Sequence, residues 1–264
     1  MKKYFVIGNP IDHSLSPKLH NYWLKENNID AIYDKKKIDE KDLQTTILEV
    51  KEKKTGGINV TVPFKKSVIP YLDKLSQEAE QTQSVNTITF DNGDLVGHNT
   101  DIAGFDMAIK NLNFNIKGKK ILILGAGGVV PSIIFALNNM NVQEITITNR
   151  TREKAENLRV LFNNIKVSEW GNLTDCHMVI NATSLGLKNE TINLNFPSSG
   201  HDKLFYDVIY NPHETNFLKM GKQLGYMAEN GKTMFVYQAQ EAFKLWHKIE
   251  PKVNMDTLKF LDND

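Results

Sequence analysis

Three short stretches near the N-terminus carry polar side chains whose types and spacing could bind or transform a polar ligand. In the first, NVTVPFKK, an apolar alternation carries Asn59 and Thr61 on its polar side. Pro63 should end that strand because proline has no N–H to donate, and Lys65 follows two residues later. An amide, a hydroxyl and an ammonium are therefore expected at one strand end, although a solvated loop is the simpler explanation.

The second stretch, residues 84–101, has the pattern of a β-hairpin. Asn92-Gly93 suits a two-residue type I′ turn, which places Asn86 opposite Asn99. Asp101 is then expected diagonally on the same face, about 7 to 8 Å from Asn86. An amide and a carboxylate would project together, but a solvent-facing polar surface explains the same pattern equally well.

The third stretch, HSLSPKLH, combines two hydroxyls with the expected start of a helix. Pro17 suits a first helical turn and biases Ser16 to an extended conformation. Ser14 and Ser16 can then present hydroxyls beside a helix N-terminus, which makes an anion site of carboxylate size. The alternative is that Ser16 is an ordinary N-cap. His13 and His20 have no evident carboxylate or thiol partner, and we interpret both as structural.

A glycine-rich turn later in the chain indicates a dinucleotide site. Gly125, Gly127 and Gly128 follow the apolar strand KILIL and precede a helical pattern. Backbone N–H groups at such a helix N-terminus can bind a pyrophosphate. The third small position of this fingerprint is occupied by Val130, with Pro131 after it, and the valine is expected to push helix and strand slightly apart.

The end of the next strand favours one cofactor over another. EITIT is followed by residues 149–152, NRTR, where an NAD enzyme places an acidic residue for the ribose 2′-hydroxyl. This stretch is cationic and has no carboxylate, and guanidinium groups suit a 2′-phosphate. The sequence therefore favours NADP over NAD, with Arg150 also able to stack on adenine. A surface arginine pair that caps the next helix is the alternative explanation.

Composition excludes several classes of partner. The 264 residues include 32 Lys and Arg against 31 Asp and Glu, so the formal net charge of +1 gives no broad electrostatic reason to bind nucleic acid or an acidic membrane. With one cysteine, Cys176, there is no internal disulfide and no CxxC motif, and the seven histidines do not form an HExxH motif. We expect a small-molecule partner, no metal and a cytoplasmic location.

One uncharged stretch, residues 121–137, could be mistaken for a membrane span. It is shorter than the roughly 20 apolar residues that a spanning helix needs, and glycines and a proline interrupt it. A buried strand, a turn and a helix fit it better. The N-terminal apolar run is too short for a signal peptide, so we expect no export.

The alternation of strand and helix patterns predicts an α/β fold with largely parallel sheets. Runs such as YFVIG, AIYDKK and KILILG alternate with helix-like PKLHNYWLKEN and TREKAENLRVLFNN. A polar, turn-prone stretch at residues 102–118 suggests a domain boundary before the glycine-rich turn. We predict an α/β substrate-binding domain, residues 1–102, and a doubly wound, Rossmann-type NADP-binding domain, residues 103–237, with a cleft between them.

Several motifs taken together resemble the shikimate dehydrogenase family. They are GNPIDHSLSPKLH, NVTVPFKK, VNTITF with HNTD, GAGG, NRT, INATSLG, YDVIYNP followed by Thr215, and GKTMFVYQAQEAF, in the family's order over essentially the whole chain. SLSP, NVTVPFK and NTD are specific to that family and its close relatives, whereas GAGG alone is not. The resemblance implies NADPH-dependent, reversible reduction of 3-dehydroshikimate to shikimate in aromatic amino-acid biosynthesis. It also implies a C-terminal segment, residues 238–264, that returns to the first domain, and a monomer or homodimer.

The resemblance implies roles for individual residues. Lys65 resembles the proton-transfer residue at the oxygen that becomes the C3 hydroxyl, and Asp101 resembles its partner. The implied substrate contacts are the carboxylate pair Ser14 and Ser16 and the ring-hydroxyl and orientation set Asn59, Thr61, Asn86, Tyr210 and Gln238. The implied cofactor contacts are the pyrophosphate turn Gly125, Ala126, Gly127, Gly128 and Val129, the 2′-phosphate patch Asn149, Arg150, Thr151, Arg152 and Lys154, and the nicotinamide surroundings Val208, Gly231 and Met234. Lys232 and Thr233 depart from the family's usual GLGM at this last position.

Two other functions compete with this interpretation. One is a quinate/shikimate dehydrogenase with relaxed substrate choice and a preference for NAD, against which Arg150 and the missing carboxylate argue. The other is a non-catalytic, NADP-sensing or partner-binding protein on the same fold, which would ordinarily lack Lys65 or Asp101. Both residues are present, so the sequence favours catalysis.

Overall fold

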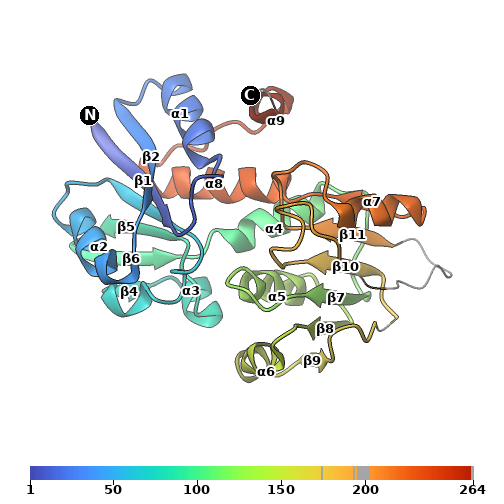
Figure 1. Ribbon diagram of the computed structural model, residues 1–264. Helices are drawn as coiled ribbons and strands as arrows, with labels where there is room; N and C mark the ends of the chain where they lie inside the picture. Colours follow the sequence, from blue (N-terminus) through green and yellow to red (C-terminus); the bar gives the residue numbers. More distant parts are fainter. Residues whose placement is uncertain (174, 193, 195–202, 263–264) are drawn as a thin grey trace. The chain divides into compact units, whose positions relative to one another are not determined.

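The structure is a computed structural model that describes residues 1–173, 175–192, 194 and 203–262 (Figure 1). Residues 263 and 264 of the predicted C-terminal segment lie outside the described residues, as do 174, 193 and 195–202 of the predicted NADP-binding domain. The chain divides into two compact units. Unit 1 comprises Met1–Gly104 and Val236–Asp264, and unit 2 comprises Phe105–Phe235.

Unit 1 is built on a sheet with the strand order β2-β1-β3-β5-β6-β4. The strands are β1 (Lys2–Gly8), β2 (Ala31–Lys37), β3 (Gly57–Val60), β4 (Lys74–Leu75), β5 (Thr87–Asp91) and β6 (Asp94–His98). The helices are α1 (Ser16–Glu26), α2 (Leu43–Lys51), α3 (Gln77–Thr82) and α9 (Met255–Asp262), with 3₁₀ turns at Glu40–Asp42 and Ile69–Tyr71. β1 pairs parallel with β2 and β3, whereas β3 and β5 are antiparallel. The sheet is thus mixed rather than wholly parallel.

The core of unit 1 follows from the apolar alternation of its strands. Ile7, Ile58, Val60 and Ile88 are each at most 2 % exposed and pack in one cluster, with α2 contributing Ile47. Alternate residues of a strand point to opposite faces, so the polar residues between these side chains face away from that cluster. Asn59 on β3 and Thr87 and Thr89 on β5 therefore lie on the face opposite this core, where β1 presents the buried Tyr4 and Val6.

The hairpin register is confirmed. Asp91 pairs with Asp94 and Thr87 pairs with His98, and the positive φ angles of Asn92 (49°) and Gly93 (94°) are those a type I′ turn requires. The strand at NVTVP is shorter than predicted, because β3 ends at Val60 and a turn follows in which the Phe64 N–H donates to the Thr61 carbonyl.

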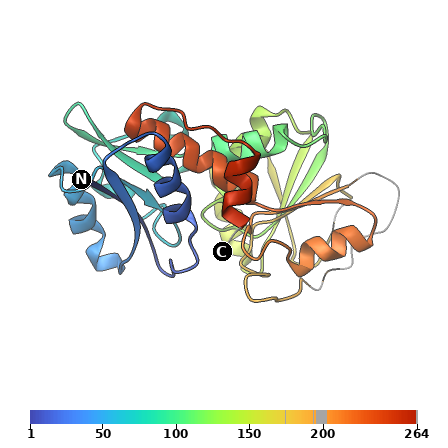
Figure 2. The same cartoon turned by 90° about the horizontal axis from the view of Figure 1, so that it is seen from above.

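Unit 2 is a parallel sheet with the strand order β12-β11-β10-β7-β8-β9. The strands are β7 (Lys120–Leu124), β8 (Glu144–Thr148), β9 (Ile165–Ser168), β10 (Met178–Asn181), β11 (Leu204–Asp207) and β12 (Met227–Glu229). The helices are α5 (Val130–Asn139), α6 (Arg152–Leu161) and α7 (Asn216–Gln223). Figure 1 shows β11, β10, β7, β8 and β9 side by side, and Figure 2 shows α7 on one face of this sheet.

This strand order is that of the doubly wound dinucleotide fold. The chain adds β8 and β9 on one side of β7 and then β10, β11 and β12 on its other side, so the strand order reverses between β7 and β10. Ligands of such sheets bind outside the carboxyl ends of the strands at that switch point. Val130, at the third fingerprint position, is the first residue of α5 and is fully buried. The valine is thus part of the packing between α5 and the sheet.

Two helices cross the boundaries between the units. α4 (Asp101–Lys110) and α8 (Lys232–His247) each begin in one unit and end in the other. The part of α8 in unit 1 packs on its sheet through Trp246, whose indole N–H donates to the Ile88 carbonyl at 3.1 Å. Among the described residues, no helix is long and apolar enough to cross a membrane.

Candidate active site

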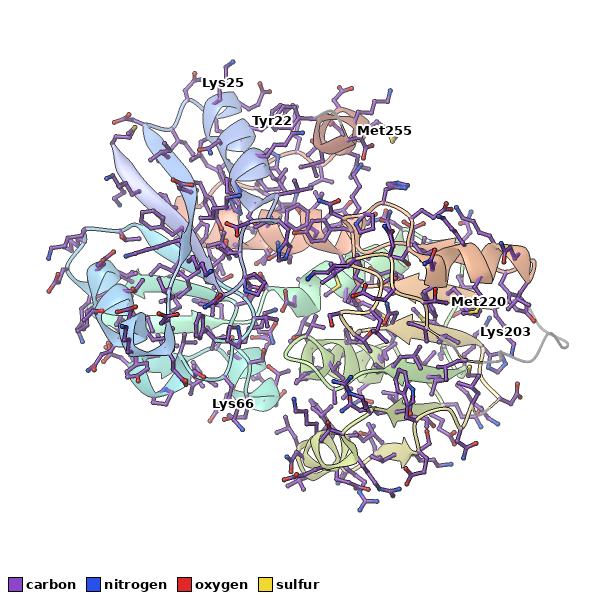
Figure 3. The ribbon with its side chains drawn as sticks, in the orientation of Figure 1. Tyr22, Lys25, Lys66, Lys203, Met220 and Met255 are labelled. Atoms are coloured by element: carbon purple, nitrogen blue, oxygen red, sulfur yellow. The ribbon has the colours of Figure 1, made fainter. Side chains whose placement is uncertain are left out.

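The turn after β3 buries one lysine and leaves its neighbour in solvent. Phe64 inserts into the core of unit 1, and the Lys65 carbonyl accepts the Val85 N–H at 2.9 Å. The Lys65 side chain is only 11 % exposed, and its ammonium donates to the Asp101 carboxylate, whose side chain is 8 % exposed. Lys66, labelled in Figure 3, is exposed. The polar strand end is therefore a buried ion pair and not a solvated loop.

Asp101 is held by its position and by a second partner. It is the first residue of α4, where the helix dipole favours a negative charge. Asn86 Nδ2 donates to Asp101 Oδ1 at 2.9 Å, and Gln238 Oε1 lies 3.4 Å from the same nitrogen. The Thr100 N–H donates to Asn86 Oδ1 at 2.8 Å. Because a backbone N–H can only donate, it fixes which end of the Asn86 amide faces Asp101.

Asn59 joins this cluster from the neighbouring strand. Its amide nitrogen donates to the Asn86 carbonyl at 3.1 Å and to Thr87 Oγ1 at 3.0 Å. Asn59, Asn86 and Asp101 are all buried. Five of the predicted residues, Asn59, Lys65, Asn86, Asp101 and Gln238, thus form one hydrogen-bonded group within unit 1.

The two predicted carboxylate-binding serines lie together at the start of α1. The Ser16 N–H donates to Ser14 Oγ at 3.3 Å. The N-cap of α1 is Leu15, without a side-chain cap bond, and Ser16 is the first helical residue. The alternative explanation of Ser16 as an N-cap is therefore wrong. Its hydroxyl makes no hydrogen bond to another described residue and remains available to a ligand.

Thr61 lies against the end of β1. A Cβ added at Gly8 would lie 2.6 Å from the Thr61 methyl group, so only glycine fits there. This close approach brings the end of β3 beside the segment that leads from β1 into the serine pair. The serines follow the carboxyl end of β1, and Thr61 and Lys65 follow that of its parallel neighbour β3.

The glycine-rich turn of unit 2 lies at the topological switch point. Gly125 has φ +108°, and a Cβ there would lie 2.9 Å from the Ala182 carbonyl oxygen that follows β10. Gly127 and Gly128 are exposed, and a Cβ at Gly127 would have only that same oxygen nearby, at 3.8 Å. Ala126 and Val129 complete the turn before α5. Its glycines leave room for a pyrophosphate to approach the backbone.

The arginines after β8 differ in what they bind. Arg152 makes ion pairs with Glu156 and Glu169. Arg150 and Lys154 are exposed and make no ion pair with any described residue. Asn149 closes the loop by donating to the Thr151 carbonyl at 2.7 Å. Arg150 and Lys154 are thus the cations of this patch that are available to a phosphate.

Two of the predicted nicotinamide residues, Val208 and Gly231, lie close together just beyond the carboxyl end of β11. A Cβ at Gly231 would lie 2.2 Å from the Val208 carbonyl oxygen, so a side chain there would displace the backbone. Met234 is buried on the first turn of α8, and Tyr210 stacks on Phe235 with ring centroids 4.4 Å apart.

A residue that sequence reasoning missed anchors the loop that carries Val208 and Tyr210. Asp207, at the end of β11, is fully buried and accepts hydrogen bonds from Thr215 Oγ1 at 2.6 Å, Asn181 Nδ2 at 3.1 Å and the Ile209 N–H at 3.0 Å. Burial raises the pKa of Asp207 to about 6, although the hydrogen bonds lower it. Its place at a strand end beside the predicted loop is the signal that could have identified it.

Known proteins match both units. Residues 6–88 match the family described as "Shikimate dehydrogenase substrate binding domain", and residues 106–191 match "Shikimate / quinate 5-dehydrogenase". The chain belongs to the shikimate dehydrogenase family. A relative from Pelagibacter ubique, named shikimate dehydrogenase (NADP(+)), is 53 % identical over 99 % of this chain and 100 % of its own length.

Solved shikimate dehydrogenases share the fold. The Aquifex aeolicus enzyme superposes with a TM-score of 0.88 at 34 % identity, covering 100 % of this chain and 98 % of that one. The Thermus thermophilus enzyme, whose structure is a complex with NADP(H) and shikimate, gives 0.89 at 30 % identity and 99 % coverage of both chains. No group of three or more His, Cys, Asp or Glu that could hold a metal occurs among the described residues.

Proposed function

We propose that this protein is an NADP-dependent shikimate dehydrogenase, which reversibly reduces 3-dehydroshikimate to shikimate in aromatic amino-acid biosynthesis. The observation that carries the proposal is the buried Lys65–Asp101 pair, braced by Asn86, in a chain of this family. In this proposal unit 1 binds the substrate and unit 2 binds the cofactor. When bound, NADPH supplies the hydride.

Lys65 performs the proton chemistry. Reduction of a carbonyl builds negative charge on its oxygen, and an ammonium beside that oxygen stabilises the charge and donates a proton to it. Asp101 accepts a hydrogen bond from Lys65, which holds the ammonium in place, and it can accept another from a ring hydroxyl. In the reverse direction the neutral amine accepts the proton from the hydroxyl that is oxidised.

The remaining polar groups of unit 1 bind and orient the substrate. Ser14 and Ser16 bind its carboxylate, and the unbonded Ser16 hydroxyl supports this role. Asn86 and Gln238 bind ring hydroxyls together with Thr61. Asn59 completes the set in unit 1 and is also committed to bonds within the protein. Tyr210, which belongs to unit 2, is the remaining proposed substrate contact. A polyhydroxylated acid is the kind of ligand that uses hydroxyl, amide and carboxylate partners at once.

The residues of unit 2 fit NADP. The open glycine turn receives the pyrophosphate, and Arg150 and Lys154 bind the 2′-phosphate, which NAD does not have. Val208, Gly231 and Met234 surround the nicotinamide. No carboxylate occupies residues 149–152, so nothing in that stretch would repel the phosphate.

One experiment tests the proposal against the quinate alternative. Initial rates are measured for shikimate and for quinate, each with NADP and with NAD. We expect the highest kcat/KM with shikimate and NADP. Comparable rates with quinate and NAD would support the relaxed dehydrogenase, and no oxidation of either acid with either cofactor would refute the proposed function.

A further inference from the structure

Tyr33 lies at the edge of the unit 1 sheet and is held firmly there. It is on β2, the edge strand, and its backbone N–H and carbonyl bond to the two ends of the Asn21 side-chain amide at 2.9 and 2.8 Å. Its ring stacks on His20 of α1, with centroids 4.2 Å apart and planes 5° apart. The residue is 2 % exposed, so its hydroxyl is buried within the protein.

The Tyr33 hydroxyl reaches across β1 to Asn59. It lies 2.6 Å from Asn59 Oδ1, and both groups are buried. The direction of this bond follows from the other end of the amide. Asn59 Nδ2 bonds to the Asn86 carbonyl, which can only accept, so the amide oxygen faces Tyr33 and the phenol is the donor.

A continuous set of hydrogen bonds leads from Asn59 to the proposed catalytic pair. Thr87 Oγ1 accepts from Asn59 Nδ2 at 3.0 Å and donates to Asn86 Oδ1 at 3.2 Å. Asn86 Nδ2 in turn donates to the Asp101 carboxylate that holds Lys65. Each member is at least nine-tenths buried, in surroundings where hydrogen bonds are strong and an unmade one is costly.

We propose that Tyr33 is a positioning residue for substrate binding, acting through Asn59. This inference rests on the proposed function. The phenol holds the Asn59 amide in one orientation, and that amide fixes the Asn86 backbone and the Thr87 hydroxyl. Without the phenol, Asn59 Oδ1 loses a buried donor and the amide shifts, so the groups that meet the substrate's hydroxyls are less well ordered.

The test compares two tyrosines of the same aromatic cluster. Tyr33→Phe removes the hydroxyl and keeps the ring on His20. Tyr4→Phe is the matched control, because Tyr4 is buried on β1 beside Trp246 and makes no bond to Asn59. We expect Tyr33→Phe to raise the KM for shikimate about threefold to tenfold, as the loss of one hydrogen bond implies, with the KM for NADP unchanged. Tyr4→Phe should change neither constant.

A double-mutant cycle asks whether Tyr33 acts through Asn59. In an Asn59→Ala background, Tyr33→Phe should have no further effect on the KM for shikimate, because its acceptor is gone. Equal effects in both backgrounds would overturn the inference. So would a Tyr33→Phe enzyme that has a lower melting temperature but a wild-type KM, since the hydroxyl would then serve stability alone. If the wild-type protein fails to oxidise shikimate, the proposed function fails before this comparison begins.

Discussion

Replacing Lys65 with methionine separates its chemistry from its packing. Methionine keeps most of the length and the apolar stem but removes the charge. If the ammonium donates a proton to the developing alkoxide, turnover should fall roughly 100-fold to 10,000-fold, the usual contribution of a general acid. The KM for shikimate should change much less, because the interaction is stronger in the transition state than in the ground state.

The structure also predicts a cost in stability for the same variant. The side chains of Lys65 and Asp101 are 11 % and 8 % exposed, so Lys65→Met leaves a carboxylate buried without its cation. Breaking a buried pair in this way costs about 3 to 5 kcal/mol. For a chain of this size that cost lowers the melting temperature by roughly 6 to 20 °C, at 2 to 4 °C per kcal/mol.

A second substitution distinguishes the two effects. In Lys65→Met/Asp101→Asn no buried charge remains unpaired, and the asparagine can still accept from Asn86. We expect the double variant to recover most of the lost melting temperature while turnover stays low. Lys66→Met is the matched control, because Lys66 is the exposed neighbour of Lys65 (Figure 3), and it should leave both quantities unchanged.

The assay is the initial rate of NADPH formation from shikimate across a pH series, together with thermal unfolding of each variant. A Lys65→Met enzyme with the turnover and pH profile of Lys66→Met would refute proton transfer by Lys65. A double variant that regains turnover along with stability would also refute it, since the single variant's loss would then have come from misfolding.

Three further predictions follow from individual contacts. Arg150→Ala should raise the KM for NADP several-fold more than the KM for NAD. It should also raise the KM for NADP more than Arg152→Ala does, because Arg152 is already paired with two glutamates. Equal increases in KM for both cofactors would count against a 2′-phosphate contact by Arg150. Ser16→Ala should weaken shikimate binding without lowering the melting temperature, whereas Ser76→Ala, which removes a cap bond to Ala79, should cost about 1 kcal/mol and leave binding intact. Burial lowers the pKa of His20 to about 3, so the folded protein should lose stability as pH falls below about 6.5, where the unfolded chain takes up a proton. In urea unfolding, the free energy of unfolding of His20→Phe should fall less between pH 6.5 and 4 than that of the wild type.

The part of the candidate site that lies on one hairpin could be predicted from the sequence. The turn Asn92-Gly93 fixes the register, and the register sets Asn86 beside the segment that leads to Asp101. The sequence did not show where the helices after the strands begin. Asp101 is the first residue of α4 and Ser16 is the first residue of α1, so neither occupies an N-cap position and each side chain lies in the candidate site.

Other parts could not be predicted because they join strands that are distant in the sequence. Tyr33 on β2 and Asn59 on β3 are separated by β1, across roughly 10 Å of sheet at the usual strand spacing. Only the sheet order shows that the long side chain of Tyr33 on β2 can reach the short side chain of Asn59 on β3. The strand AIYDKK gives no sign of this contact, because tyrosine is common in β-strands whatever its side chain touches.

The arginines show how neighbouring residues of one type acquire different roles. The stretch NRTR contains two guanidinium groups that composition alone treats as equivalent. Glu156 is four residues beyond Arg152 on α6, a spacing at which helical side chains meet, and Glu169 follows β9, which pairs with β8. Arg150 precedes the helix and has neither partner among the described residues. The helix start and the sheet order together therefore decide which arginine is available for the proposed 2′-phosphate contact. Only the helix start can be read from the sequence.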